Sequence, residues 1–398
     1  MPLRIATALL LPLTAFAFGA LRAMNQLLFE WQVVCAGAAF AFVGVRYWHP
    51  YRGLGLAAFA LFGTFLVSLA AAASGSWEWP MAFAAVGLSV AFTRLAIFFD
   101  HSRSGRRPGV GILVGTLCVI GILGGASILT FGEYRGLGRW VLPHHFLWMP
   151  IITGILTLFA VAAFFRPAFE FACEPLLWLM YRVRASGPGV SQIPQRGPCI
   201  VIANHACWFD PLFLVKVLPR PITAMMISRF YDLPVLRPLL RHVFHTIRVP
   251  DHHYKKEETP EEIREAIAAL DRGECLVLFP EGFLQRTEER LLRRFGRGIW
   301  QILAARPDTP VFCCWIEGAW GSYTSYFNGP PTKNKRRDFR RPIRVAVPSP
   351  IVVDRETLSH HLATRFLLMN QTLESRKLLD LPAAPPYELP ACNEEPGS

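Results

Sequence analysis

The residue types most able to do chemistry gather in one short segment, residues 204–210. This segment follows the apolar run Cys199–Ala203 and contains His205 and Asp210, with four residues between them. A carboxylate at this spacing can orient the imidazole through one ring nitrogen, which leaves the other nitrogen able to accept a proton. The segment therefore predicts a general base at a strand end. A loop histidine, with Asp210 only capping a helix that begins at Pro211, fits the same residues.

A second segment, Phe279-Pro280-Glu281-Gly282, also follows an apolar run directly. Glu281 is the first charged residue after this run, and Gly282 beside it allows a ligand to approach closely. Several arginines follow within the next residues: Arg286, Arg290, Arg293, Arg294 and Arg297. Because guanidinium groups pair with phosphate in a bidentate manner, this segment favours a phosphate-bearing substrate. The alternative is an ordinary turn acid beside a solvated or membrane-facing basic surface.

Two further groups of residues suggest other chemistry. Cys207 lies two residues from His205, so a cysteine nucleophile with an acyl-enzyme intermediate is conceivable. Four histidines between residues 242 and 253 have spacings that suit a metal, but only Asp251 stands near them as a further ligand. We therefore expect surface histidines there rather than a metal site.

From residue 198 onward, short apolar runs alternate with helical patterns, which is typical of α/β layering. The expected strands are Cys199–Ala203, Ile222–Ile227, Thr246–Val249, Cys275–Phe279, Val311–Ile316 and Ile343–Val347. One helix should be capped by Thr259, with Pro260 in its first position and Glu262 completing a capping box. A second helix is expected over residues 298–305, and a disordered tail after Leu381.

The first 165 residues have a different composition. They hold 10 of the 41 Lys and Arg residues and 4 of the 29 Asp and Glu residues of the 398-residue chain. Six apolar stretches can be distinguished: 5–21, 31–47, 54–73, 79–99, 109–130 and 146–165. A spanning helix needs about 20 apolar residues, so we expect six transmembrane helices. The first stretch also resembles a signal peptide, although more apolar segments follow it.

The loop charges predict how this region is oriented. We count the arginines in the N-terminus and in the loops between the six predicted spans. Six of them lie on the side of the membrane that also holds residues 166–398, and three lie on the opposite side. Since positively charged loops stay in the cytoplasm, both termini should face it. The nine cysteines lack CxxC and framework spacing, which agrees with a reducing compartment. Ionisable residues are scarce in the spans, which counts against a transporter.

The junction between the halves combines aromatic and basic residues. Residues 169–184 hold several aromatic residues and end with Arg182 and Arg184, so we expect an interfacial helix. The basic run 333–341 is the densest in the chain. Beside a membrane region it indicates anionic lipid rather than nucleic acid as the partner. We expect a transmembrane region over residues 1–165, followed by an interfacial helix and linker over 166–190. Residues 191–355 should form an α/β domain with a mixed sheet flanked by helices. A C-terminal helix and a disordered tail should occupy residues 356–398.

Taken together, the pattern NHxxxxD and the later FPEG resemble the motifs of the glycerolipid acyltransferase family, over about residues 191–355. Two further blocks carry the resemblance, Ile227-Ser228-Arg229 and residues 310–318. The family includes lysophosphatidate acyltransferases and the 2-acylglycerophosphoethanolamine acyltransferases that bacteria fuse to multi-spanning membrane regions. One departure is Phe283-Leu284-Gln285-Arg286, where the family usually has Thr-Arg-Ser.

The resemblance implies a membrane-bound enzyme, placed in a bacterial inner membrane with its catalytic domain in the cytoplasm. His205 would take the proton from a lysophospholipid or acylglycerol-phosphate hydroxyl while Asp210 holds the ring. The acyl donor would be acyl-CoA or an acyl carrier protein, entering as a substrate, and no metal or bound cofactor would be needed. Substrate-binding roles carry over to Asn204, Ser228, Arg229, Glu281, Gly282 and Arg286. The alternative is a non-catalytic membrane protein whose acyltransferase-like domain only binds lipid.

Overall fold

The computed structural model describes residues 50–74, 148–251, 260–333 and 335–388. The chain divides into two compact units, residues 1–173 and residues 174–398. Each unit is described by itself below.

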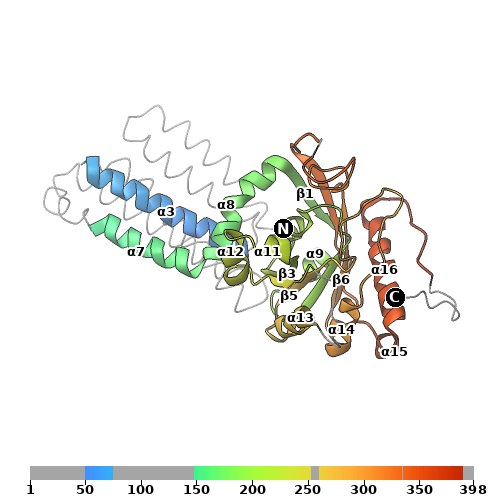
Figure 1. The fold of residues 1–398 in the computed structure, drawn as a ribbon. Coiled ribbons are helices and arrows are strands. Elements are labelled where there is room, and N and C mark those ends of the chain that lie inside the picture. Colours follow the sequence, from blue (N-terminus) through green and yellow to red (C-terminus); the bar gives the residue numbers. More distant parts are fainter. Residues whose placement is uncertain (1–49, 75–147, 252–259, 334, 389–398) are drawn as a thin grey trace, which may run out of the picture. The chain divides into compact units, whose positions relative to one another are not determined.

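The first unit contains two described apolar helices and the start of a third: α3 (Pro50–Ser74), α7 (Trp148–Ala163) and α8 (Phe165–Met180) (Figure 1). Small side chains form the contact between α3 and α7, among them Ala57, Ala58 and Ala160. Two of the six predicted spans, 54–73 and 146–165, fall on α3 and α7. The other four lie outside the described residues.

The described helices of this unit are apolar but short or bent. None of them is by itself long and apolar enough to cross a membrane. Residues 150–163 and Phe165–Met180 reach that length only as a pair, and a bend of 90° separates the two.

The second unit is built on a seven-stranded mixed sheet in the order β1-β7-β6-β2-β5-β3-β4. The strands are β1 (Tyr181–Ser186), β2 (Cys199–Ala203), β3 (Ile222–Ile227), β4 (Ile247–Val249), β5 (Cys275–Leu278), β6 (Val311–Glu317) and β7 (Arg341–Ala346). Five neighbouring strands, from β4 to β6, are parallel. β7 pairs antiparallel with β6 and parallel with β1. The predicted mixed sheet is therefore confirmed.

All six predicted strands exist, with ends shifted by at most two residues. The prediction missed β1, because residues 169–184 were expected to form a single helix. The helix instead ends at Met180, and the next residues pair with β7 from Tyr181 to Ser186. Tyr181 is buried beneath α10 (Asp210–Val217), where its ring meets Phe213 edge-on with centroids 4.9 Å apart. This tertiary packing outweighs the local helical pattern.

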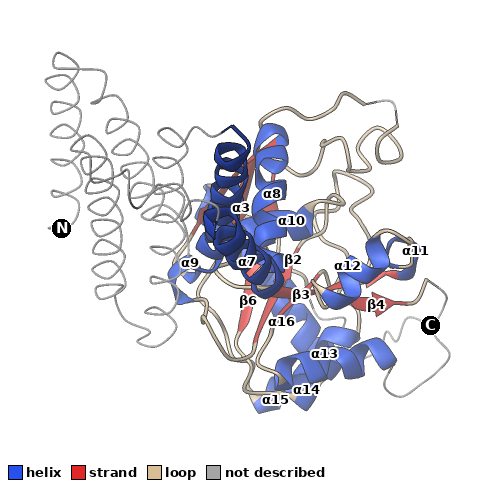
Figure 2. Ribbon diagram, turned by 90° about the vertical axis from the view of Figure 1, so that its left-hand side faces the viewer, coloured by secondary structure: helices blue, strands red, loops and turns tan. Residues whose placement is uncertain are grey.

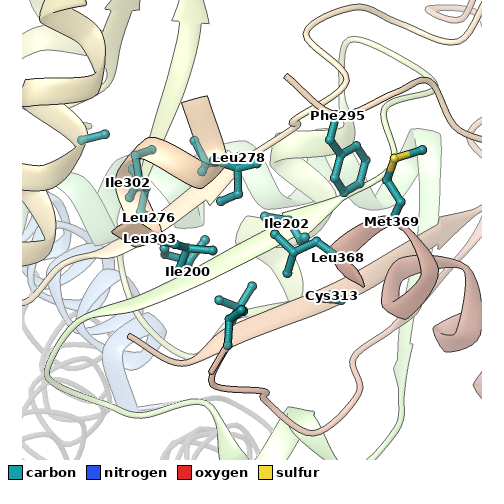
Figure 3. Packing of buried hydrophobic residues seen from close by; sticks show 14 of the residues in the cluster. Ile200, Ile202, Leu276, Leu278, Phe295, Ile302, Leu303, Cys313, Leu368 and Met369 are labelled. Carbon is teal, nitrogen blue, oxygen red and sulfur yellow. The ribbon is translucent and has the colours of Figure 1, made fainter. Parts of the chain in front are cut away.

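Helices cover both faces of the sheet (Figure 2). Along β2 the side chains alternate, so that Ile200 and Ile202 face one cluster while Val201 faces the other. The first cluster includes side chains of α13 (Glu261–Asp271), α14 (Gly298–Ala305) and α16 (His361–Glu374). Figure 3 shows Ile302 of α14 and Leu368 of α16 in this cluster. The second packs against α10. Because both faces are covered, the central strands are continuously apolar. Short helices complete the unit: α9 (Gly189–Gln192), α11 (Ser228–Tyr231), α12 (Leu236–His242), α15 (Arg355–Leu358) and the 3₁₀ helix Ser375–Leu379.

Two helix predictions can be compared with the structure. The helix over residues 298–305 has the predicted ends, as α14. The helix α13 begins at Glu261, one residue later than predicted, with Pro260 as its N-cap residue and no side-chain cap bond. Thr259, the predicted cap, lies outside the described residues.

The segment after Leu381 is ordered as far as it is described, contrary to the predicted disordered tail. The Tyr387 hydroxyl donates to the Leu292 carbonyl at 2.6 Å. Its backbone forms two hydrogen bonds with the side chain of Asn370 on α16. These bonds fix residues 382–388, which composition alone could not show. Residues 389–398 lie outside the described residues.

Arg220 joins three loops at the start of the central strands. Its guanidinium donates to the carbonyl oxygens of Pro194, Gly197 and Gly273, at 2.6–3.0 Å. These loops precede β2 and β5, so the bonds fix the point at which both strands enter the sheet. These carbonyls are only partly exposed, so losing the donor would leave them poorly satisfied.

We expect Arg220→Ala to destabilise the chain by at least about 2 kcal/mol, because hydrogen bonds to a charged group are worth about 1.5–3 kcal/mol each. The measurement is the thermal unfolding midpoint of the full chain. Arg306→Ala is the matched control, since it removes an exposed ion pair with Asp271 and should change the midpoint little. Equal midpoints for the two variants would show that Arg220 does not join the loops.

Candidate active site

The predicted pair of His205 and Asp210 forms in the structure. The two residues follow β2, and Nδ1 of His205 lies 2.9 Å from Oδ2 of Asp210. The Asp210 side chain is fully buried, whereas the His205 side chain is 20% exposed. The described residues form no hydrogen bond with the second ring nitrogen, Nε2 of His205. The geometry is that of a general base that is oriented on one side and open on the other.

Asp210 also organises the backbone of its own loop. Its Oδ2 accepts hydrogen bonds from the backbone N–H of Ala206 at 2.6 Å and of Cys207 at 2.8 Å. Asp210 stands in the first turn of α10, where the helix dipole favours a negative charge. The helix-capping role of the alternative interpretation is not observed, because the N-cap residue is Phe209 and no side chain caps the helix. The carboxylate instead holds the loop backbone and orients the ring of His205.

The ring of His205 is further fixed by stacking on Phe279. The two ring centroids are 4.2 Å apart, and the planes are inclined by 24°. The backbone of His205 is fixed as well, because its carbonyl accepts from the Gln285 N–H at 2.7 Å. The two sequence motifs therefore meet at the ends of β2 and β5, where functional groups of an α/β sheet gather.

Glu281 connects the two motifs through its carboxylate. Oε1 accepts from the backbone N–H of His205 and Oε2 from that of Arg293, both at 2.8 Å. The side chain is buried, and this burial raises the pKa of Glu281 from 4.5 to about 7, against the lowering effect of the two backbone donors and of His205. Both carboxylate oxygens are thus engaged by the protein. The predicted substrate-binding role of Glu281 stays a prediction, beside this observed role in holding the histidine loop.

Asn204 connects β2 to its neighbour β6. Its side-chain amide donates to the Ile316 carbonyl at 3.0 Å and accepts from the Ile316 N–H at 2.7 Å. Asn204 is buried, so these bonds satisfy its amide. They hold the strand end from which the catalytic loop leaves. The predicted substrate contact of Asn204 stays a prediction.

The other predicted substrate residues lie in two places. Ser228 and Arg229, at the start of α11, line an open hollow of about 440 Å³. An edge-on ring contact between Trp208 and Phe230, with centroids 5.4 Å apart, connects α11 to the catalytic loop. Arg286 is exposed, and its guanidinium lies 3.5 Å above the centre of the Tyr326 ring.

Gly282 is exposed at the turn that follows β5. Its φ is +70°, a backbone conformation that a glycine adopts without strain. Its N–H donates to the Phe279 carbonyl at 3.0 Å, which closes the turn. The glycine of the second motif is therefore required by the backbone turn. The predicted ligand approach at Gly282 stays a prediction.

Cys207 is a poor nucleophile in this setting. Its side chain is fully buried, and Sγ donates to Oδ1 of Asp210 at 3.2 Å. Burial and the nearby Asp210 carboxylate raise the pKa of the thiol well above its usual range, which disfavours the reactive thiolate. Among the described residues, no three His, Cys, Asp or Glu side chains are grouped to hold a metal. His252 and His253 lie outside them.

Two supporting residues were missed from the sequence. The backbone N–H of Arg293 is a partner of Glu281, and Leu292 beside it is held by Tyr387 from the C-terminal segment. A backbone donor leaves no trace in residue type, and Tyr387 is far from the motifs along the chain. The tyrosine within an otherwise Pro-rich and Ala-rich tail was the one available signal.

Comparison with known proteins agrees with this geometry. Residues 187–317 match the family model described as Acyltransferase. Uncharacterized proteins of Mycobacterium tuberculosis and Mycobacterium bovis are each 31% identical over 170 residues, which cover 39% of this chain and 44% of theirs. One from Mycobacterium leprae is 28% identical over 151 residues, which cover 35% of this chain and 37% of that protein. The matches therefore span less than half of these relatives.

Among solved structures, a similar chain is the 1-acyl-sn-glycerophosphate (LPA) acyltransferase PlsC from Thermotoga maritima. The match has a TM-score of 0.42 and 17% sequence identity, and it covers 65% of this chain and 91% of that chain. The family match, in contrast, includes the segment with His205 and Asp210 as well as Glu281. His205, Asp210 and Glu281 therefore lie within the segment that is similar to the Acyltransferase family.

Proposed function

We propose that this chain is a glycerolipid acyltransferase, which moves a fatty acyl group from a thioester donor to a hydroxyl of a lysophospholipid or an acylglycerol phosphate. The observation that carries the proposal is the His205–Asp210 pair, with Nδ1 held at 2.9 Å and the ring partly exposed inside an acyltransferase domain. The donor is acyl-CoA or an acyl carrier protein, and either would enter as a substrate.

In the proposed reaction the acyl group passes directly from the thioester to the acceptor hydroxyl, without an acyl-enzyme intermediate. Nε2 of His205 accepts the proton of the acceptor hydroxyl as its oxygen attacks the thioester carbonyl. The tetrahedral intermediate, stabilised by backbone amides, then expels the thiolate. The thiolate takes the proton back from His205, which yields the ester and the free thiol. Asp210 stabilises the imidazolium between these two proton transfers.

The finer features of the substrate are proposed from charge and exposure. The guanidinium of Arg286 is oriented by Tyr326 and exposed, so its N–H edge can meet a phosphate on the acceptor. Ser228 and Arg229 offer a second polar contact in their hollow. The proposed location, the cytoplasmic side of a bacterial inner membrane, rests on the charge distribution of residues 1–165.

His205→Ala should lower acyl transfer on the order of 10²–10⁴-fold, because the general base is removed. Asp210→Asn should lower it as well, since the amide no longer stabilises the imidazolium. Both are measured as the rate of ester formation from acyl-CoA and a lysophospholipid, with the thermal midpoint as the check on folding.

Cys207→Ser is the control, and it should retain activity within a few-fold of the wild type. An inactive Cys207→Ser protein that still folds would support the acyl-enzyme route. Wild-type rates in His205→Ala would refute the assignment of His205 as the base, whereas a folded wild type without any acyl transfer would favour the non-catalytic lipid-binding alternative.

The raised pKa of Glu281 predicts a pH dependence of stability. Between pH 4.5 and about 7 the folded chain binds more protons at Glu281 than the unfolded chain does. The contribution of this group to the free energy of unfolding therefore falls as pH rises through that window, and is constant above it. Glu281→Gln should remove this slope while leaving one of the two backbone donors, at His205 or Arg293, without an acceptor.

The measurement is the free energy of unfolding of the full chain across that pH window. Glu317→Gln is the matched control and should keep the wild-type slope, because Glu317 accepts one side-chain bond from Trp315 outside the site. The same slope in the wild type and Glu281→Gln would contradict the prediction.

Arg286→Ala should raise the KM for a phosphorylated acceptor about tenfold or more, because a hydrogen bond to a charged group is lost. The KM for the acyl donor should change little. Arg355→Ala, on α15, is the control for removing a positive charge elsewhere. Equal changes in both KM values, or full activity on an acceptor without phosphate, would refute the proposed phosphate contact.

A further inference from the structure

A second hollow of the same unit shares no residue with the catalytic motifs. It has a volume of about 230 Å³ and lies where the end of α8 meets the edge strand β1 and the far end of α10. Four cationic side chains line it together with an apolar wall that includes Leu177 and Trp178; the cations are Arg182, Arg184, Lys216 and Arg340. Such a lining suits a ligand that combines a negative charge with an apolar part.

The nearby carboxylates neutralise only one of these four cations. Of the four cations, Glu174 forms an ion pair with Lys216 only. Asp338 is almost buried, and it accepts from the Tyr181 hydroxyl at 2.7 Å and from the Tyr323 N–H at 2.8 Å. Its ion pair is with Arg341, at 3.5 Å, which does not line the hollow. The three remaining arginines therefore leave a net positive charge for a bound anion.

Arg340 is held in place by its backbone and by an aromatic ring. Its φ is +47°, a conformation that few residues other than glycine adopt, and its N–H donates to the Leu179 carbonyl at 2.9 Å. The guanidinium lies 4.2 Å from the centre of the Trp178 ring. The cation is thus positioned in advance on the wall of the hollow, which lowers the entropic cost of binding an anion there.

Large apolar side chains stand exposed beside these cations. Leu176 is 62% exposed, Trp178 53%, Leu179 46% and Phe339 71%. An acidic protein would satisfy the arginines but gain little from these side chains. A lipid surface satisfies both, because aromatic and aliphatic groups enter the acyl boundary while arginines meet the headgroup phosphates.

We propose that this hollow binds the phosphate of an anionic phospholipid, with Leu176, Leu179 and Phe339 against its acyl chains. Arg182, Arg184 and Arg340 supply the phosphate contacts. The site is separate from catalysis and does not depend on the proposed function. It revises the interfacial helix expected from the sequence, because Arg182 and Arg184 lie on the edge strand of the sheet and not on that helix.

The test measures binding of short-chain phosphatidylglycerol to the full chain purified in detergent, with phosphatidylcholine of the same chain length as the comparison. The wild type should bind phosphatidylglycerol at least about tenfold more tightly, since guanidinium contacts to a net anion are favoured. The double variant Arg182→Gln/Arg340→Gln should lose that preference. Arg272→Gln/Arg355→Gln, which removes two arginines outside the hollow, should keep it.

A second readout locates the lipid at the hollow. Phosphatidylglycerol with brominated chains should quench part of the intrinsic fluorescence of the wild type, and that part should be missing in Trp178→Phe. Thermal midpoints near the wild-type value confirm that each variant is folded. These measurements need no enzyme activity, so their failure leaves the proposed reaction untouched.

Three results would overturn the proposal. The first is an unchanged lipid preference in Arg182→Gln/Arg340→Gln. The second is displacement of phosphatidylglycerol by inorganic phosphate at equal concentration, which would indicate a site for free phosphate. The third is loss of binding to acyl carrier protein in that variant while lipid binding persists, which would identify an acidic protein as the partner.

Discussion

The catalytic loop depends on one fully buried carboxylate, that of Asp210. A buried negative charge is stable only when hydrogen bonds replace its lost water. Here two backbone N–H groups and Nδ1 of His205 meet Oδ2, and the thiol of Cys207 donates to Oδ1. The loop must therefore curl around the carboxylate, and the orientation of the imidazole follows from that requirement. The same carboxylate whose charge interacts favourably with the dipole at the start of α10 thus orients the base.

Glu281 extends this constraint from one strand end to the next. Its two oxygens bridge the loop after β2 and the loop after β5, so neither loop can move without leaving an oxygen of this buried carboxylate unpaired. Leu292, next to the second donor, is in turn held by Tyr387. The histidine is consequently supported by three segments that are remote in sequence. It is held in place by hydrogen bonds from backbone N–H groups to the carboxylates of the two motifs.

The sequence predicts the parts of this arrangement that residue type determines. Continuous apolar runs identify the central strands such as β2, because strands covered on both faces are apolar throughout. The pairing of His205 with Asp210 follows from spacing. β1 could not be found in this way, since Tyr181 and its neighbours extend a helical pattern and become a strand only by pairing with β7. The partners of Glu281 are backbone groups, which no side-chain pattern reveals.

The short helix α10 connects the candidate active site to the second hollow and fixes the distance between them. Asp210 lies in its first turn, and Lys216 on the wall of the second hollow lies six residues later, which is about 9 Å along the axis at 1.5 Å per residue. A helix of this length does not bend appreciably, so the catalytic base is held at a fixed short distance from the hollow. If the hollow rests on headgroup phosphates, His205 stands close to headgroup depth. A lysolipid could then present its hydroxyl to Nε2 while its acyl chain stays in the bilayer, because the hydroxyl and the phosphate belong to the same headgroup region. The membrane would then select acceptors by depth before any side chain recognises them.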